Sequence, residues 1–452
     1  MHTAGMELLI STTAAIILVI ISAQICGSLA IKIGQPAVVG EMIAGILLGP
    51  TAFGHFTPGF SSYIFTSDTK LVLYVMSMIG LGLYMFLVGA EHENSKTKGE
   101  RALPFVLGIV GFMFPVIFGA LAGGSVALNL KPVEISFEVY LLFIGIALSV
   151  TAFPMLARVL QARAMTKTLF GAAAIKTAAI DDALAWCALA VVGAMAASGT
   201  ANKAFFGTIL PAGLLALILF TVAPVIFKKH MEKSVRKGNI SDQLLSSLLT
   251  ITLISGLISD YIGIYSVFGG FIAGITLPRV QGFAKLLNDR LLQILRCFFL
   301  PIFFAYSGMN TDIWQTFNLQ TLWLLPVLLI AAILSKGIAA VIVLRFYKWS
   351  WEETISMAAL MNARGLMILI CVNIGLSMGI INTQIFSVMV LVAIITTALA
   401  IPVYNRYFTP EREEAARKKW DQLDLLEKNE HSVDINTLPL EKGPQAAQHQ
   451  KS

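Results

Sequence analysis

The sequence TLFGAAAIKTAAIDDALAWCALAVVGAMAAS occupies residues 168–198 and is long and apolar enough to cross a lipid bilayer as one helix. It nevertheless contains two adjacent acids, Asp181 and Asp182, and a lysine, Lys176, shortly before them. Charged side chains near the middle of a bilayer are costly and seldom face lipid. We therefore expect this segment to carry a functional site that faces protein or water.

The composition of the chain is typical of a polytopic membrane protein. The 452 residues are 57% hydrophobic and 13% charged, and the apolar runs repeatedly exceed the roughly 18 residues of a membrane-spanning helix. The pattern shows neither the polar face of a soluble helical protein nor the short alternation of a membrane β-barrel. It predicts an all-α fold of about thirteen transmembrane helices, at residues 8–31, 36–53, 71–90, 102–126, 137–157, 168–198, 205–227, 243–259, 264–278, 291–309, 320–344, 353–377 and 384–405.

The cysteines and histidines argue against a bound cofactor. Each of the 4 cysteines lies in a different apolar segment without a C-x-x-C spacing, and all 6 histidines fall in predicted loops or tails. Intramembrane haem or metal ligands are therefore not expected. The net charge of +6 is explained by basic cytoplasmic loops, so nucleic acid is not an expected partner.

The distribution of Lys and Arg predicts how the chain is oriented. One alternate set of loops carries seventeen of these residues and the other carries only Lys70, Lys131 and Lys203. Because cytoplasmic loops retain positive charge, the N-terminus is expected outside and the C-terminus in the cytoplasm. Residues 8–405 are then the transmembrane domain. Residues 406–452 form a short cytoplasmic tail, charged and helical at first and disordered further on.

Four polar positions in different segments fall at similar depth in the membrane. At about 1.5 Å per helical residue they lie about 17 to 24 Å from the start of their segments. In a hydrocarbon layer about 30 Å thick they share the middle region, where charged groups face one another or water. The four are Asp181, Lys336, Arg364 and Thr151.

The two adjacent acids cannot play the same role, because neighbouring helix positions point about 100° apart. We expect one of them to line a cavity and the other to meet a partner on a neighbouring helix. Desolvation and mutual repulsion favour proton binding by at least one acid. A monovalent cation prefers the same carboxylate oxygens, so cation and proton would compete for one site. The alternative is a salt bridge that only locks helices together, with Lys336 as a structural counter-charge.

Two segments are predicted to contain breaks in their helices. SVTAFP at 149–154 includes Pro154, whose ring disrupts the preceding turn, and MNARGL at 361–366 places Asn362 and Arg364 in apolar surroundings. Non-helical backbone at this depth persists only where it faces protein or a wet cavity. With the seventh segment as a connector, the breaks fall at corresponding places in two halves of opposite orientation, which is the inverted-repeat plan of secondary transporters.

The motifs together resemble the second bacterial family of monovalent cation:proton antiporters. The resemblance covers nearly all of residues 8–405, and its individual glycine motifs are weak whereas their order and spacing are specific. It depends on GQPAVVGEMIAGILLGP, SVTAFP, AAIDDALAW, FGGFIAGI, FFLPIFFAYSGM, LSKGIAA and MNARGL.

This resemblance implies an electrogenic homodimer with two crossed discontinuous helices that exposes its site to each side in turn. It implies that Asp182 is the principal carboxylate for the cation, bound transiently, and for the proton. Asp181 either shares the proton load or pairs with Lys336, and Thr151 lies at the helix crossing. Supporting positions are Arg364, Asn362, Pro154 and Lys176, of which Lys176 either lines an inner funnel or extends to the membrane surface.

The leading hypothesis is Na⁺ (or Li⁺)/proton exchange in the plasma membrane, and three alternatives remain. K⁺/proton exchange is the first, because oxygen ligands alone do not reveal the size of the ion cavity. An organic-anion symporter could use the same inverted-repeat plan but would not need the acid pair and the lysine. An intramembrane aspartyl protease would need its two acids on separate helices. The expected partners are therefore the two exchanged ions, lipid and a second copy, and the protein is not expected to be an enzyme.

Overall fold

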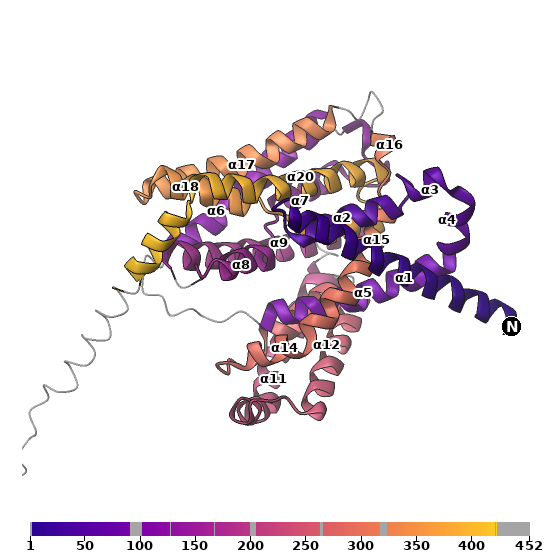
Figure 1. Cartoon of the computed structure of the whole chain (residues 1–452), viewed down its shortest axis with the longest axis horizontal. Coiled ribbons are helices and arrows are strands. Elements are labelled where there is room, and N and C mark those ends of the chain that lie inside the picture. The colour runs from indigo at the N-terminus through magenta and orange to yellow at the C-terminus, as the bar shows by residue number, and fades with distance from the viewer. Residues whose placement is uncertain are drawn as a thin grey trace, which may run out of the picture.

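The computed structural model describes residues 2–90, 102–126, 128–166, 168–198, 205–262, 265–316, 323–420 and 422. Every regular element in these ranges is a helix (Figure 1). The first half contains α1 (His2–Lys32), α2 (Ala37–Leu48), α3 (Phe53–Phe56), α4 (Pro58–Ile64), α5 (Ser67–Ala90), α6 (Ala102–Val126), η1 (Leu128–Leu130), α7 (Phe137–Ser149), α8 (Phe153–Ala162) and α9 (Leu169–Ser198). The second half contains η2 (Phe205–Ile209), α11 (Leu210–Lys237), α12 (Asp242–Ile262), α13 (Ser266–Ile275), α14 (Phe283–Ile294), η3 (Leu295–Phe299), α15 (Leu300–Met309), α16 (Ile313–Thr316), α17 (Leu324–Phe346), α18 (Trp351–Met361), α19 (Gly365–Ser377) and α20 (Thr383–Tyr407).

The predicted membrane-spanning segments are all present as helices. Within the described residues, 11 helical segments are long and apolar enough to cross a membrane, and α7 and α13 are shorter apolar helices. These account for the thirteen predicted segments and confirm a multi-pass, all-α membrane protein. The main difference is in α11, which continues to Lys237 and so extends beyond the predicted end at residue 227, because a polar, basic helical turn can project past the bilayer.

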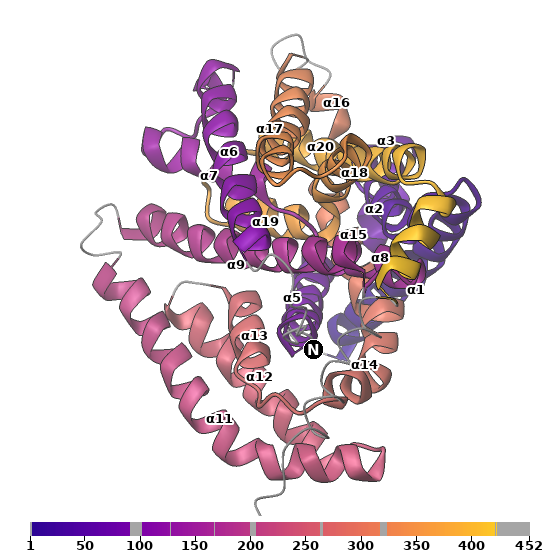
Figure 2. The same cartoon turned by 90° about the vertical axis from the view of Figure 1, so that its left-hand side faces the viewer.

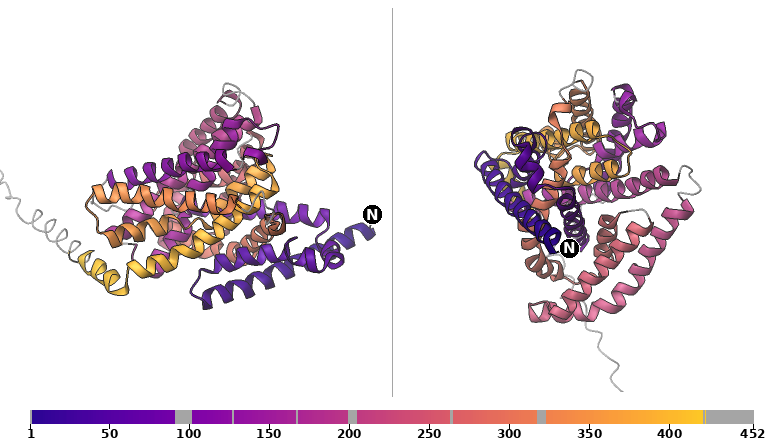
Figure 3. Two further views of the ribbon diagram at one scale, coloured as in Figure 1. Left: turned by 90° about the horizontal axis from the view of Figure 1, so that it is seen from above. Right: turned by 90° about the vertical axis from the view of Figure 1, so that its right-hand side faces the viewer.

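The helices form two groups that pack side by side. The first, called the crossing bundle, contains α6–α9 and α17–α20, and the second, called the outer group, contains α1, α2, α5 and α11–α15. Figure 2 shows α11 and α12 on the side of the molecule away from α6 and α17. In the left view of Figure 3 the orange and yellow helices of the crossing bundle lie along purple α6. The site described below lies within the crossing bundle.

Glycines allow the helices of the outer group to approach closely. A Cβ atom on Gly45 of α2 would overlap the carbonyl of Phe304 in α15, and one on Gly274 of α13 would overlap the carbonyl of Phe86 in α5. Side chains at these positions would force the helices apart. The glycine pairs of the sequence therefore act in helix packing, as expected for small residues at helix contacts in membranes.

Basic loops that are far apart in the sequence meet at one end of the molecule, which we call the basic face. Arg163, directly after α8, lies 2.8 Å from Glu413 in a helix formed by residues 410–420, called here the C-terminal helix. Arg290 of α14 donates a hydrogen bond to Asn239 in the loop before α12. Residues 421 and 423–452, the greater part of the predicted tail, lie outside the described residues.

Candidate functional site

Two interrupted helices meet at the centre of the crossing bundle. The first break separates α7, which ends at Ser149, from α8, which begins at Phe153. The second separates α18, which ends at Met361, from α19, which begins at Gly365. The backbone N–H of Ala152 donates to the carbonyl of Ala363 at 2.9 Å, so the two non-helical stretches are in direct contact. Both predicted breaks are therefore present, and they cross.

The residues at the breaks satisfy backbone groups that the missing turns leave free. Pro154 lies in the first turn of α8, where the missing N–H of proline costs nothing. The N–H of Gly365 at the start of α19 donates to the hydroxyl of Thr397 in α20 at 2.9 Å. Gly365 has φ of 44°, a backbone conformation that favours glycine. The second break thus depends on this glycine and on a hydroxyl that the sequence motifs did not single out.

A lysine joins the first break to the acidic helix α9. Lys336 of α17 donates to Oδ2 of Asp181 at 2.8 Å and to the hydroxyl of Thr151 at 2.8 Å. The Thr151 hydroxyl in turn donates to the carbonyl of Met361, the last residue of α18, at 3.1 Å. Lys336, Asp181 and Thr151 are all fully buried. One chain of hydrogen bonds thus connects α17, α9 and the two broken helices.

The second acid, Asp182, has a different environment. Its side chain is only 2% exposed, and its Oδ1 atom has no hydrogen-bond partner among the described residues. Oδ1 of Asp181 is likewise without a partner in this part of the chain. A buried carboxylate oxygen without a partner is unfavourable unless a proton or a cation occupies it. The pair is therefore asymmetric, with Asp181 held by a lysine and Asp182 available for a ligand.

Arg364 adds a second buried positive charge at the second break, and it forms no ion pair with an acid among the described residues. It is fully buried and donates to the carbonyl of Ala332 in α17 at 2.8 Å and to Oδ1 of Asn362 at 3.3 Å. Its Nε and Nη1 atoms have no hydrogen-bond partner among the described residues. Two acids, Asp181 and Asp182, and two bases, Lys336 and Arg364, thus lie in one buried region.

Cavities lie between the crossing bundle and the outer group on both sides of the site. Near the basic face, cavities of about 570 and 280 Å³ share Tyr84 and Arg296 in their walls. Toward the opposite face, a cavity of about 240 Å³ is lined by residues that include Tyr265 and Asn373. The smaller cavity near the basic face reaches Ala152, one residue from Thr151 at the crossing.

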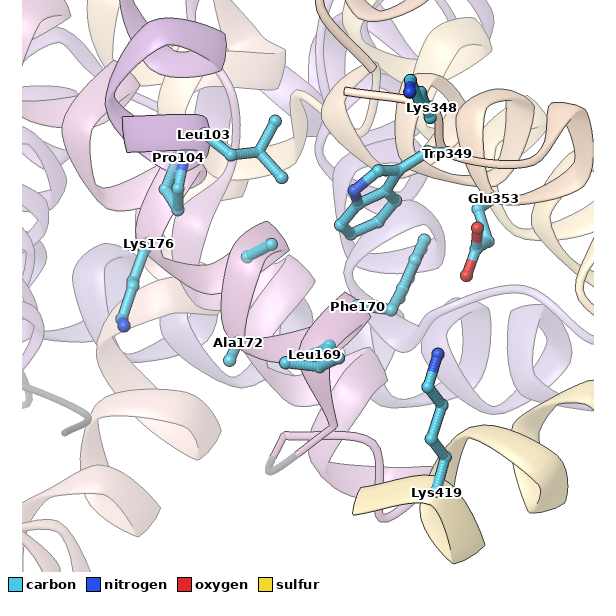
Figure 4. Close-up of a pocket in the computed structure, with 11 residues that line it drawn as sticks. Leu103, Pro104, Leu169, Phe170, Ala172, Lys176, Lys348, Trp349, Glu353 and Lys419 are labelled. Carbon is cyan, nitrogen blue, oxygen red and sulfur yellow. The ribbon is translucent and has the colours of Figure 1, made fainter. Parts of the chain in front are cut away.

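The structure brings together most of the positions singled out in the sequence. Asp181, Asp182, Thr151, Lys336, Arg364 and Asn362 all lie at the helix crossing, and Pro154 begins the broken helix beside it. Lys176 lies apart from them. It lines a separate cavity near the basic face, as Figure 4 shows, together with residues of α6, α18 and the C-terminal helix.

Sequence reasoning missed two hydrogen bonds that join the crossing bundle to the outer group. The Tyr265 hydroxyl lies 2.6 Å from the hydroxyl of Ser377 at the end of α19. Asn373 of α19 donates to the hydroxyl of Ser307 in α15 at 2.9 Å. A polar amide such as Asn373 within an otherwise apolar segment was the available signal.

Comparison with known proteins agrees with this geometry. Residues 17–404 match the family described as "Sodium/hydrogen exchanger, transmembrane". The chain belongs to this family. The match spans both broken helices, the acid pair and Lys336, so the entire site lies within the shared region.

Individual relatives of the exchanger family support the same assignment. The Na(+)/H(+) antiporter NhaS4 of Synechocystis is 36% identical over 398 residues, which are 87% of this chain and 96% of that protein. The K(+)/H(+) antiporter 1 of Saccharomyces cerevisiae is 28% identical over 89% of this chain but only 48% of its own length. In fold, the chain is similar to the sodium proton antiporter MjNhaP1 of Methanocaldococcus jannaschii, with a TM-score of 0.64 and 15% identity over 90% of this chain and 98% of that one.

Proposed function

We propose that this protein exchanges a monovalent cation, Na⁺ or Li⁺, for protons across a membrane. One observation carries the proposal: Asp182 is a buried carboxylate with an unpartnered oxygen at the crossing of two broken helices, in a chain of the sodium/hydrogen exchanger family. An ionised carboxylate cannot stay buried without compensation. A proton or a cation must therefore hold it, and because each occupies the same oxygens, binding of one releases the other.

The second acid makes the exchange electrogenic in this proposal. Asp181 stays ionised while Lys336 donates to it, and it becomes a second proton acceptor when that contact opens. A cycle that moves one cation against two protons transfers one net charge. In the cation-free part of the cycle the contact opens and each acid binds one proton; when a cation enters beside Asp182, both protons leave and Lys336 pairs with Asp181 again.

Alternating access follows from the position of the cavities. Space toward the basic face and space toward the opposite face both lie where the crossing bundle meets the outer group. A rigid-body movement of the crossing bundle against the outer group would open one side and close the other around a fixed site. The broken backbone at Thr151 and the exposed helix ends supply dipoles and carbonyl oxygens for a cation that has lost its water.

The second candidate function differs from the first in the cation that is exchanged. NhaS4 is described as a Na(+)/H(+) antiporter, and the yeast relative as a K(+)/H(+) antiporter. The higher identity and nearly full coverage of NhaS4 favour Na⁺ for this chain. K⁺/proton exchange is the second candidate. Both acids lie on the single helix α9, which does not suit an intramembrane protease, and the acid pair with its lysine has no use in an organic-anion symporter.

The proposed setting is the plasma membrane, with the basic face in the cytoplasm and the N-terminus outside. The predicted excess of Lys and Arg in one set of loops supports this orientation. We further propose a homodimer in contact with lipid, and a division of the chain into the transporter of residues 8–405 and a tail of residues 406–452. Apolar side chains exposed along α1 and α11 are available for a second copy and for lipid.

The experiment that tests the function is transport in proteoliposomes. Purified protein is reconstituted, and internal pH is followed after addition of Na⁺, Li⁺ or K⁺ at several imposed membrane voltages. We expect Na⁺ and Li⁺ to release protons. We also expect the rate of proton release to depend on the imposed voltage. A rate that does not respond to voltage would contradict the electrogenic cycle, and no response to any of the three cations would contradict exchange itself.

A further inference from the structure

A cavity of about 340 Å³ near the basic face lies outside the proposed exchange site. Its size is within the range of small-molecule sites, at the lower end. Figure 4 shows Lys348 and Lys419 on opposite sides of the rings of Trp349 and Phe170, and Lys176 farther away beside Pro104. The carboxylate of Glu353 is the only acidic group among its described lining residues. Three lysines and one glutamate give this cavity two net positive charges.

The backbone adds to the positive potential. Helices α6, α9 and α18 all begin beside the cavity, and residues from the first turns of each line it, such as Leu103, Leu169 and Glu353. The N-terminal ends of helices carry partial positive charge from unsatisfied N–H groups. Glu353 is already engaged, because its Oε2 accepts from the backbone and hydroxyl of Ser350 at 3.0 Å. The cavity therefore presents lysine side chains and positive helix ends to a ligand. The carboxylate of Glu353, its one acid among the described lining residues, is held at the start of α18.

Lys348 occupies a backbone conformation that is unfavourable for its side chain. It has φ of 60° at the position after Tyr347, the C-cap of α17, where glycine is the commonest residue. A non-glycine residue in this conformation is strained, because its Cβ atom lies too close to the following carbonyl oxygen. The conformation directs the chain so that Trp349 packs against Phe170, with ring centroids 6.1 Å apart. Such conformations cluster at functional sites, and here one supplies both a lysine and an aromatic wall.

Lys419 reaches the cavity from a helix that is firmly attached. In the C-terminal helix, Glu413 pairs with Arg163 at 2.8 Å and Arg412 pairs with Glu352 of α18 at 2.9 Å. Arg417 donates to the carbonyl of Arg163 at 2.7 Å. These contacts hold Lys419 over the cavity from outside the membrane helices. A ligand in the cavity would contact the C-terminal helix and α9, the helix that carries both site acids.

We propose that this cavity binds a phosphate-bearing anion, held by Lys348 and Lys419 with its organic part against Trp349 and Phe170. Two net positive charges match a doubly charged phosphate group, and lysine binds phosphate as a point charge. The phosphate group can belong to an anionic lipid at the membrane surface or to a soluble phosphate ester. This site is distinct from the exchange site, and its occupation can be measured without transport.

The test is binding by the full-length protein in detergent, followed by thermal unfolding. The soluble probe is inorganic pyrophosphate as its Tris salt, compared with choline chloride at equal ionic strength. The lipid probe is phosphatidic acid, whose phosphate group can carry two negative charges, in mixed micelles, compared with phosphatidylcholine. We expect one probe to raise the midpoint of the parent, with about tenfold weaker binding in Lys348→Gln/Lys419→Gln, equivalent to about 1.4 kcal/mol. A response to pyrophosphate identifies a soluble phosphate compound, and a response to phosphatidic acid alone identifies a lipid head group.

Lys418→Gln is the matched control. Lys418 is the neighbour of Lys419 on the same helix, but it pairs with Glu414 at 2.7 Å and does not line the cavity. We expect this variant to bind the effective probe as the parent does. Lys419→Gln alone, at an exposed position, repeats the test should the double variant fold poorly. The proposal is overturned if neither probe binds the parent, or if Lys418→Gln weakens binding as much as Lys419→Gln.

Discussion

The ammonium group of Lys336 in α17 lies 2.8 Å from Oδ2 of Asp181 in α9, and both side chains are fully buried. A buried charge pair is not by itself a source of stability, because removing both charges from water costs about as much as their attraction returns. Its presence is better explained by a function that needs the pair to open and close. Thr151, which accepts from the same ammonium group, ties that opening to the first broken helix.

Replacing Lys336 by alanine should destabilise the protein and change the charge moved per cycle. Asp181 would lose its partner, and removing one member of a buried pair typically costs about 3–5 kcal/mol. Uptake of a proton by Asp181 would reduce this loss of stability. Asp181 would then no longer take part in the exchange cycle. The melting temperature in detergent and the transport current in proteoliposomes measure the two effects.

The double variant Lys336→Ala/Asp181→Ala separates these explanations. Because it leaves no buried carboxylate without a partner at this position, we expect it to melt higher than Lys336→Ala. Unchanged melting and unchanged current in Lys336→Ala would show that the observed contact has no energetic role.

Asp182→Asn should abolish exchange while the protein still inserts and folds. Asparagine has the shape of aspartate but carries no charge, so neither a proton nor a cation can bind in exchange for the other. We expect the internal pH of proteoliposomes to stay at the level of empty liposomes after Na⁺ addition. Heat released on Na⁺ addition to purified protein, measured by calorimetry, should be lost as well.

Asp68→Asn provides the matched control for this substitution. Asp68 is an exposed acid in the first turn of α5, outside the crossing bundle. We expect this variant to exchange at the rate of the parent. Exchange by Asp182→Asn at the same rate would instead assign the cation to another group.

Thr151→Val should weaken the helix crossing. Valine keeps the shape but removes the hydroxyl that joins Lys336 to the carbonyl of Met361. Leaving buried polar groups unpaired costs about 1–3 kcal/mol, so the midpoint of thermal unfolding should fall and exchange should slow. Thr151→Ser keeps the hydroxyl and should stay close to the parent in both measurements; equal losses in the two variants would argue for a packing role only.

Much of the fold was predictable because lipid imposes strict rules on sequence. Long apolar runs gave the membrane helices, and polar or proline-containing motifs within them marked both breaks. The similar depths of Asp181 and Lys336 indicated that they could meet, and they do. Each of these features depends on spacing along one helix or on membrane depth, which a single sequence records.

The remaining features depend on how helices rotate against one another, which spacing does not determine. Adjacent acids point in different directions, but their spacing alone does not say which one faces Lys336, and only the family resemblance named Asp181. The contact of Arg364 with the carbonyl of Ala332 was not predictable, because every residue offers such a carbonyl. The position of Lys176 was also left open, since it depends on packing against α6 and the C-terminal helix.

Tyr265→Phe should open the cavity on the face opposite the basic loops. The hydrogen bond between Tyr265 and Ser377 joins the outer group to the crossing bundle there, and such a bond contributes about 1 kcal/mol. Its loss should favour the open conformation roughly fivefold. The measurement is the labelling rate of Asn310→Cys, which lines this cavity, by an impermeant maleimide, with the native cysteines replaced by serine. Tyr306→Phe removes a hydroxyl from the same cavity and should label at the parent rate, whereas faster labelling in both variants would show that the Tyr265 contact does not close this side.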